Sequence, residues 1–214
     1  MIFKIKENSQ NLDNVLKEVA LLLKKGKVGA IPTETFYGLS ANPFSEEALK
    51  RLFYLKKREP DKPILLLLSS LDDLTRVCAR IPGIALKLIK AFWPGPLTLV
   101  LPAKRGLSSL LTAGTNTIGV RLSSCELTRK IARAFGGPIT GTSANISGRP
   151  PCKTAEEVLR EIPEIDFVVD AGETKGDKPS TVIEILEKDI RLIREGAIAF
   201  EEIMRIVGEK KGEV

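Results

Sequence analysis

The sequence contains no histidine. This absence excludes Ser-His-Asp and Cys-His hydrolase chemistry, imidazole general bases and every metal site that needs a histidine ligand. Its three cysteines, Cys78, Cys125 and Cys152, are too widely spaced for a C-x-x-C motif, and their odd number argues against a disulfide framework. We therefore expect reduced thiols in a cytoplasmic protein and no metal ion bound by the protein itself.

Long hydrophobic runs are also missing. Apolar stretches such as Ile64–Leu68 and Leu97–Leu101 are about five residues long, which predicts strands rather than a membrane span. Met1–Glu7 alternates apolar and charged residues, a pattern that predicts an edge strand and differs from a signal peptide. We expect no association with a membrane.

The charge balance is moderately basic. The 214 residues include 33 Lys and Arg against 27 Asp and Glu, which gives a net charge of +6. A chain of this length suits one domain, so we expect residues 1–214 to form a single domain with its core at about 12–207. The charge admits a nucleotide or RNA as partner, but the acidic residues are spread along the same chain, so charge alone selects neither.

Helix and strand patterns are intermingled along the chain. Apolar positions three and four residues apart predict a helix over Asn11–Lys25, and Ser45 is placed to cap a second helix that ends near Lys56. Other helices are predicted over Leu71–Ala79, Ile84–Phe92, Glu126–Phe135, Ala155–Arg160 and Phe200–Val207. Strands are predicted over Val28–Ile31, Pro63–Leu68, Leu97–Leu101, Thr117–Leu122, Ile139–Thr142, Phe167–Asp170, Thr181–Leu186 and Ile190–Arg194.

This order predicts an α/β fold in which a twisted sheet of parallel and antiparallel strands is flanked by helices. The short strands near the end of the chain predict at least one antiparallel pair. Ser123 with Glu126, and Thr154 with Glu157, match the capping-box pattern at the starts of two helices.

The densest group of cations is the loop Lys56–Pro63, which contains Lys56, Arg58 and Lys62 between a helix and a strand. The sequence has no Walker A motif and no dinucleotide fingerprint, so a nucleotide would have to be held in another way. Prolines on this loop would stiffen it and fix its cations for phosphate oxygens. The alternative is a solvated helix end, where basic residues favour the negative end of the helix dipole.

A second candidate is the loop Gly141–Gly148, in which Ser143 and Asn145 offer donors to a phosphate or a nucleobase. A plain turn or helix cap is the alternative. Arg121 and Arg194 each end a predicted strand, where ligands of α/β proteins collect and where arginine can bind a carboxylate or phosphate with two nitrogens. Each arginine on its own could equally be an ordinary surface residue.

Together these segments resemble the YrdC-type threonylcarbamoyl-AMP synthase family in its short, single-domain form. The resemblance rests on segments that occur in family order over about Leu12–Val207: Pro32–Leu39, Lys56–Arg58 with Lys62–Pro63, Trp93–Thr98, Val120–Arg121, Ser143–Gly148, Ser180–Thr181 and Arg194–Ala197. The composite K-x-R and S-x-N signature is its most specific part. One departure is Ile64–Leu68, which is wholly apolar where some members carry a polar residue.

The resemblance implies that L-threonine, bicarbonate and ATP are converted to threonylcarbamoyl-AMP and pyrophosphate, with Mg²⁺ accompanying ATP. It implies transfer proteins that use the product to modify adenosine in tRNA. By matched position, Lys56 and Arg58 would be catalytic, and the ATP-binding residues would be Lys56, Arg58, Lys62, Thr117, Ser143, Asn145 and Arg194. The threonine-binding residues would be Thr35, Arg121, Ser180 and Thr181.

Two other functions remain open from the sequence. A module that binds double-stranded RNA in ribosome maturation would use the same basic surface, and its affinity would fall steeply with salt. The related carbamoyl-phosphate-using domain of hydrogenase maturation factors carries Cys-rich zinc motifs, which this sequence lacks.

Overall fold

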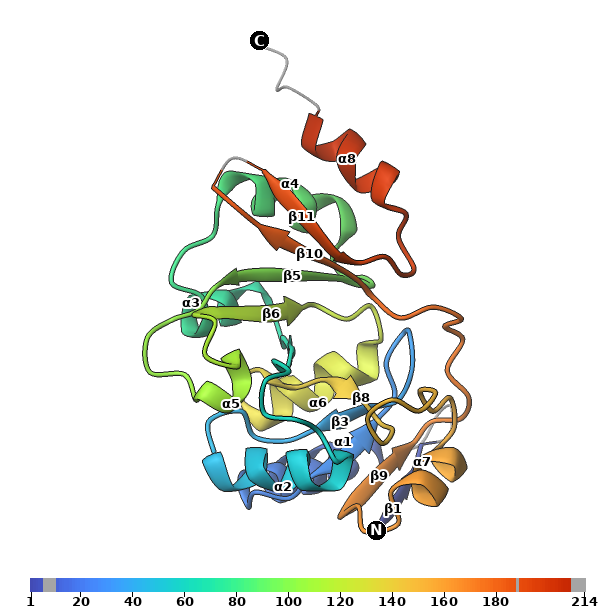
Figure 1. Ribbon diagram of the computed structural model, residues 1–214. Helices are drawn as coiled ribbons and strands as arrows, with labels where there is room; N and C mark the ends of the chain where they lie inside the picture. Colours follow the sequence, from blue (N-terminus) through green and yellow to red (C-terminus); the bar gives the residue numbers. More distant parts are fainter. Residues whose placement is uncertain (6–10, 188, 209–214) are drawn as a thin grey trace.

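The computed structural model describes residues 1–5, 11–187 and 189–208. Its strands form two mixed sheets rather than the single sheet that we expected. One sheet has the strand order β1-β9-β2-β3-β8 and the other the order β11-β10-β5-β6-β4-β7. Figure 1 shows the first sheet beside the N-terminus and the second towards the C-terminal helix, with helices around both. The α/β class and the mixture of parallel and antiparallel pairs are confirmed.

The strands are short. The five-stranded sheet contains β1 (Ile2–Lys4), β9 (Phe167–Asp170), β2 (Gly29–Ile31), β3 (Gly38–Ser40) and β8 (Thr142–Ser143). The six-stranded sheet contains β11 (Ile190–Arg194), β10 (Thr181–Ile185), β5 (Leu97–Pro102), β6 (Thr117–Arg121), β4 (Leu66–Leu67) and β7 (Ile139–Thr140). The predicted edge strand at the N-terminus is confirmed as β1, although Lys6 and Glu7 lie outside the described residues. The expected antiparallel pair is β10 with β11.

The helices follow the predicted apolar periodicity. They are α1 (Leu12–Lys24), α2 (Glu46–Lys56), α3 (Leu74–Val77), α4 (Gly83–Phe92), α5 (Ser109–Thr112), α6 (Glu126–Phe135), α7 (Ala155–Glu161) and α8 (Phe200–Gly208), with a 3-10 turn at Leu71–Asp73 before α3. The sequence did not reveal α5 or β3, because both are too short to show a period. Among the residues that the structure describes, no helix combines the length and the apolarity that crossing a membrane requires.

Two helix starts test the capping patterns. At α7 the capping box is confirmed: Thr154 Oγ1 accepts from the Glu157 amide at 3.2 Å, and a Glu157 carboxylate oxygen accepts from the Thr154 amide at 3.3 Å. At α6 the predicted capping box is wrong, because Cys125 occupies the cap position and its side chain makes no cap hydrogen bond. Ser123 lies too early in the chain to cap α6, and its hydroxyl instead bonds Glu34.

The chain passes from one sheet to the other at Gly141. The sequence predicted one strand over Ile139–Thr142, but β7 pairs with β4 and β8 pairs with β3. The Gly141 amide donates to the Leu65 carbonyl at 3.0 Å, and a Cβ atom at Gly141 would lie only 2.4 Å from Cγ of Leu67. This close crossing places Ser143, the last residue of β8, at the junction of the two sheets.

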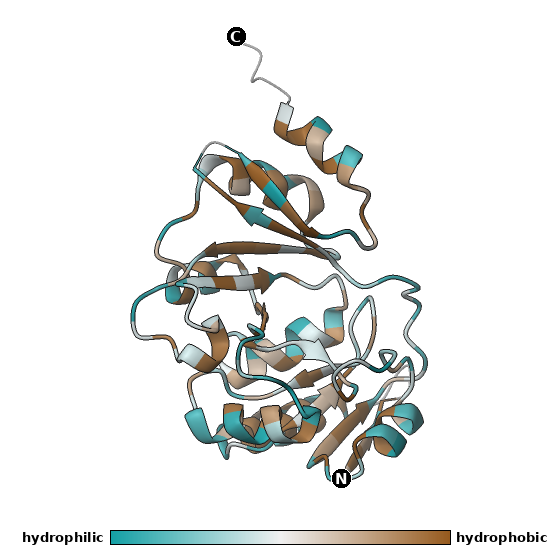
Figure 2. Cartoon of the chain, in the orientation of Figure 1, coloured by the Kyte–Doolittle hydropathy of each residue, from teal (hydrophilic) through white to brown (hydrophobic). Residues whose placement is uncertain are grey.

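The apolar residues form two clusters. The larger one lies on and between the sheets and includes Leu66, Leu99 and Val120, whereas the smaller one joins α1, α6 and the outer face of β9. Figure 2 shows that the strands are mostly hydrophobic, whereas the surrounding helices carry both hydrophobic and hydrophilic residues. Burial of these apolar faces is the main favourable contribution to folding.

Phe167 in β9 packs across its neighbour in β2, Gly29, and this contact allows no side chain at that position. A Cβ atom at Gly29 would lie 2.1–2.4 Å from three atoms of the Phe167 ring. We expect Gly29→Ala to lower the free energy of unfolding by about 1–3 kcal/mol, because the buried ring must move. A thermal melt measures this as a fall of about 2–4 °C per kcal/mol.

Gly83→Ala is the matched control, because no atom lies within 4 Å of a Cβ at Gly83, the first residue of α4. The control should melt at or slightly above the wild-type temperature. Equal melting temperatures for the two variants would contradict this account of the contact between β2 and β9.

Candidate functional site

The last residue of α2 places a buried cation at the junction of the sheets. Ser45 caps the start of α2, accepting from the Ala48 amide at 3.3 Å, and Lys57 ends the helix in the left-handed conformation at φ 48°. Lys56 is therefore held in the final turn and is only 2% exposed. Its side chain points to the loop that follows β8.

Four oxygens, two of Ser143 at the end of β8 and two of Asn145 in the loop, surround the Lys56 ammonium group. Nζ donates to the main-chain oxygens of Ser143 at 2.6 Å and Asn145 at 2.9 Å, and to Ser143 Oγ at 3.3 Å and Asn145 Oδ1 at 3.2 Å. The loop also donates one hydrogen bond to Lys56: the Ser147 amide bonds the Lys56 carbonyl at 2.9 Å. An ammonium group has three N–H donors, so the loop already engages all of them.

Opposing effects act on the protonation of Lys56. Burial, with a smaller contribution from the Arg58 guanidinium, lowers the pKa of Lys56 to about 7. The four surrounding oxygens favour the charged form. In this structure Nζ contacts only oxygens of Ser143 and Asn145 among the described residues. The predicted contact of Lys56 with the triphosphate stays a prediction.

Asn145 and Ser143 differ in what they can offer a ligand. The Asn145 side chain is buried, and its Nδ2 donates to the carbonyls of Ile146 at 2.9 Å and Arg149 at 2.6 Å. Both ends of the amide therefore organise the loop. Ser143 is half-buried, and its hydroxyl accepts from Lys56, which leaves its own proton available to a ligand.

The remaining cations of the basic loop lie nearer the surface. Half-buried Arg58 donates from Nε to the Lys62 carbonyl at 3.1 Å and from Nη2 to the Pro63 carbonyl at 2.7 Å. Burial lowers the pKa of Arg58, and Asp61 partly offsets this shift. Lys62 is exposed, and within the described part of the chain no residue bonds its ammonium group. Both cations remain available for an anion.

Arg121 is a second buried cation, at the end of β6. It is 3% exposed, and burial lowers the pKa of its guanidinium although Glu34 opposes this shift. Nη1 donates to Thr35 Oγ1 at 3.4 Å, and Nε lies 3.6 Å from Glu34 Oε1. No described residue bonds Nη2, which unlike Nε is not sealed from solvent.

The turn 33–36 fixes Thr35 and Glu34 beside Arg121. Thr33 Oγ1 donates to the Phe36 carbonyl at 2.7 Å and accepts from the Thr35 and Phe36 amides at 3.1 and 3.2 Å. The connection from β9 to β10 crosses this turn, and a Cβ atom at Gly176 would lie 2.3 Å from the Thr35 carbonyl. Figure 1 shows this connection running from the five-stranded to the six-stranded sheet.

Arg194, at the end of β11, is held by Ser180. Nη2 donates to the Ser180 carbonyl at 2.8 Å and to Ser180 Oγ at 3.2 Å. Burial lowers the pKa of Arg194, and repulsion from the Arg121 guanidinium lowers it further. The two arginines are therefore near enough to interact, and a shared anion would relieve their repulsion.

The structure does not bring all of the predicted residues together. The fully buried Thr181 hydroxyl donates to the Ile198 carbonyl at 2.6 Å and accepts from the Gly196 and Ile198 amides, both at 3.0 Å, so its bonds hold the turn after Arg194. Thr117 begins β6 and bonds Thr115 at 2.8 Å, about 13 Å by strand rise from Arg121. The ATP-binding role of Thr117 stays a prediction.

The sequence predicts no functional-site role for Glu34 or Ser123. Glu34 lies within the family-matching segment Pro32–Leu39, but only its neighbour Thr35 is predicted to bind a ligand. A carboxylate beside a strand end that also carries an arginine is the signal that could have found it. Ser123 was interpreted as a helix cap, and only the tertiary contact with Glu34 reveals its other role.

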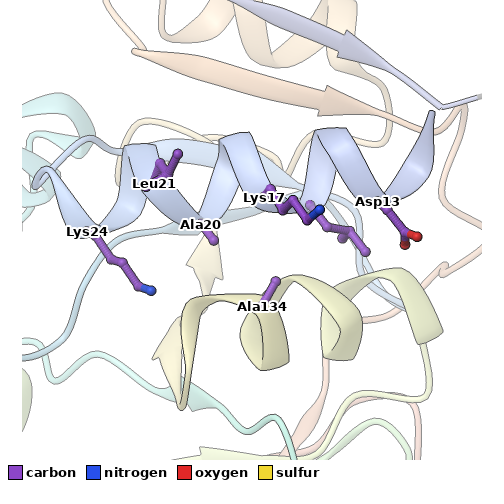
Figure 3. Close-up of a pocket in the computed structure, with 7 residues that line it drawn as sticks. Asp13, Lys17, Ala20, Leu21, Lys24 and Ala134 are labelled. Atoms are coloured by element: carbon purple, nitrogen blue, oxygen red, sulfur yellow. The ribbon is translucent and has the colours of Figure 1, made fainter.

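A groove between α1 and α6 is separate from this cluster. It has a volume of about 530 Å³, and Figure 3 shows Ala20 on α1 facing Ala134 on α6 across it, with Asp13, Lys17, Leu21 and Lys24 along α1. None of the candidate residues lines it. Across the described ranges, no group of three or more Cys, Asp or Glu residues is placed to hold a metal ion.

Sequence comparison identifies relatives over most of the chain. A sequence model of the Sua5/YciO/YrdC family, described as telomere recombination, matches residues 21–196. A threonylcarbamoyl-AMP synthase of Pyrococcus abyssi is 39% identical over 195 residues, which cover 91% of this chain and 57% of the relative. A threonylcarbamoyl-AMP synthase of Bacillus subtilis is 36% identical over 198 residues, which cover 92% of this chain and 57% of the relative. A putative threonylcarbamoyl-AMP synthase of Methanocaldococcus jannaschii is 34% identical over 206 residues, which cover 95% and 97%.

Solved structures agree with this relationship. The crystal structure of P. abyssi Sua5 complexed with L-threonine superposes with a TM-score of 0.92 at 37% identity, covering 98% of this chain and 61% of that protein. Escherichia coli YciO shares the fold, with a TM-score of 0.83 at 23% identity over 95% and 98% of the two chains. The chain thus spans about three fifths of the P. abyssi protein and nearly all of YciO. On these matches, the chain belongs to the Sua5/YciO/YrdC family.

Proposed function

We propose that this chain is an L-threonylcarbamoyladenylate synthase, which makes threonylcarbamoyl-AMP and pyrophosphate from L-threonine, bicarbonate and ATP. The observation that carries the proposal is the buried Arg121 guanidinium, whose Nη2 no described residue bonds and whose ion-pair partner among the described residues is Glu34, 3.6 Å from Nε. Relatives named threonylcarbamoyl-AMP synthase, at 34–39% identity, and the L-threonine complex of P. abyssi Sua5 support it.

Arg121 would bind the threonine carboxylate, because no described residue bonds its Nη2, and because Thr35 lies beside Arg121 and Ser180 beside Arg194. The threonine amine then attacks the carbon of bicarbonate, and loss of water leaves a carbamate. A carbamate oxygen attacks the α-phosphorus of ATP, the bond to the β-phosphate oxygen breaks, and pyrophosphate leaves. These steps need alignment and stabilised charge at phosphorus rather than a covalent enzyme intermediate.

Arg58, Lys62 and Arg194 would neutralise the triphosphate, with Mg²⁺ entering together with ATP. Ser143 would donate its hydroxyl proton to the nucleotide, and Lys56 and Asn145 would act by fixing the loop that presents Ser143. We propose that residues 1–214 act as a single domain in the cytoplasm. The labile adenylate would pass to the proteins that transfer the threonylcarbamoyl group to tRNA.

Pyrophosphate release from ATP and bicarbonate, measured with and without L-threonine, tests this function. We expect release to depend on threonine, and Arg58→Ala to reduce kcat/KM about ten- to a hundredfold because one charge-assisted contact to phosphate is lost. Arg80→Ala is the control, since Arg80 is exposed and pairs with Glu187 at 3.3 Å, away from the candidate residues in the fold as described. Threonine-independent release, or equal rates in Arg58→Ala and wild type, would contradict the proposal.

The loop role of Lys56 predicts a local effect that hydrogen exchange can detect. In Lys56→Met, amides of residues 143–147 should exchange faster and turnover should fall, because four oxygens lose their common donor. Lys56→Arg should not restore protection, since a planar guanidinium cannot replace the compact ammonium group. Lys57→Met, at the exposed neighbouring residue, is the control. Unchanged exchange in Lys56→Met would refute the role.

The lowered pKa of Lys56 also predicts how stability changes with pH. Between about 7 and 10.5 the unfolded chain retains a proton that the folded chain has lost, so the free energy of unfolding rises with pH. Urea unfolding of wild type and Lys56→Met across this range should therefore show a difference that shifts in favour of wild type as the pH rises. A difference that stays constant or shifts the other way would show that the four oxygens outweigh burial.

A further inference from the structure

Glu34 carries a half-buried carboxylate that the proposed chemistry does not use. Its Oε1 is sealed from solvent and accepts no hydrogen bond in the described structure. The nearest cationic nitrogen is Arg121 Nε at 3.6 Å, which is also sealed and unbonded. Unsatisfied buried polar atoms are costly, so two of them facing each other call for an explanation.

Ser123 ties the other carboxylate oxygen to the strand end that carries Arg121. Its fully buried hydroxyl donates to Glu34 Oε2 and accepts from the Cys125 amide at 3.2 Å. The Ser123 carbonyl in turn accepts from Arg129 Nη1 on α6. The carboxylate and the Arg121 guanidinium are thus held by one short segment, which fixes their relative position.

Glu34 lies on the Nε side of the Arg121 guanidinium, and this position leaves the two terminal nitrogens, Nη1 and Nη2, for a ligand. Nε is the donor nearest the side-chain stem, and Glu34 faces it. Of the two terminal nitrogens, Nη1 has one long contact with Thr35 at 3.4 Å and Nη2 has no partner among the described residues. Two parallel terminal N–H groups are what arginine uses to bind a carboxylate. Burial lowers the pKa of Arg121, and the charge of Glu34 opposes this shift.

We propose that Glu34 is a positioning residue that acts through Arg121: it engages Nε and so directs both terminal nitrogens to the carboxylate of the amino-acid substrate. The inference rests on the proposed function, because it takes the ligand of Arg121 to be threonine. The gap of 3.6 Å exceeds a hydrogen bond by a few tenths of an ångström, so a small turn of the guanidinium on ligand binding closes it.

The test combines threonine binding with a double-mutant cycle. We expect Glu34→Gln, which keeps the shape and removes the charge, to weaken L-threonine binding about tenfold in calorimetry and to leave the KM for ATP within about twofold. In kcat/KM for threonine, Glu34→Gln should have little further effect once Arg121→Lys is present, because residues that act as a unit are not additive. Glu126→Gln is the control, since exposed Glu126 pairs with Lys130 at 2.9 Å.

The other possible results of this test separate failure of the inference about Glu34 from failure of the proposed function. Unchanged or tighter threonine binding in Glu34→Gln, equal losses for ATP and threonine, or additive effects in the cycle would overturn the inference and leave the proposed function standing. Absence of threonine binding by the wild type would overturn both. If Glu34→Gln lowers the melting temperature, Ser123→Ala provides a second test, because it keeps both charges and removes the hydroxyl that bonds Oε2 and the Cys125 amide. It should weaken threonine binding in the same direction and by a smaller factor.

Discussion

The buried ammonium group of Lys56 is the interaction on which the candidate site depends. It joins the end of α2 to Ser143, the last residue of β8, and to Asn145 in the loop that follows, shortly after the chain has passed from the six-stranded to the five-stranded sheet. Without a common donor, four oxygens of Ser143 and Asn145 would face one another at close range. Burial of the lysine is unfavourable for its charged form and lowers the pKa of Lys56 to about 7. In return, the hydrogen bonds from Nζ hold a loop of small polar residues in one conformation.

The second constraint is electrostatic. Arg121 and Arg194 come from strands of the same sheet, lose hydration on folding and repel each other. Glu34 offsets only part of this charge, and Ser180 and Thr35 supply neutral acceptors and donors around it. An anion at this place would satisfy the unbonded terminal nitrogen of Arg121, so the proposed site would be formed before any ligand arrives. Such preorganisation fits a reaction in which negative charge gathers at phosphorus.

Local sequence patterns were sufficient to place most helices and strands, because apolar periodicity and caps such as Ser45 and Thr154 act within a few residues. The division into two sheets could not be predicted. It depends on the crossing at Gly141, where the chain packs against Leu65 and Leu67, residues far away in sequence. The family motifs located the candidate segments, but the partners of Lys56 lie 87 and 89 residues away, and no local pattern encodes that contact. For the same reason Ser123 was interpreted as a cap.

The central claim is that the clustered cations align L-threonine, bicarbonate and ATP for formation of a mixed carbamoyl adenylate. The most direct measurement is mass spectrometry of the products formed by the purified chain with ATP, L-threonine and ¹³C-labelled bicarbonate. The account predicts threonylcarbamoyl-AMP that carries the label and forms only when threonine is present. ATP turnover that yields no labelled adenylate would contradict it.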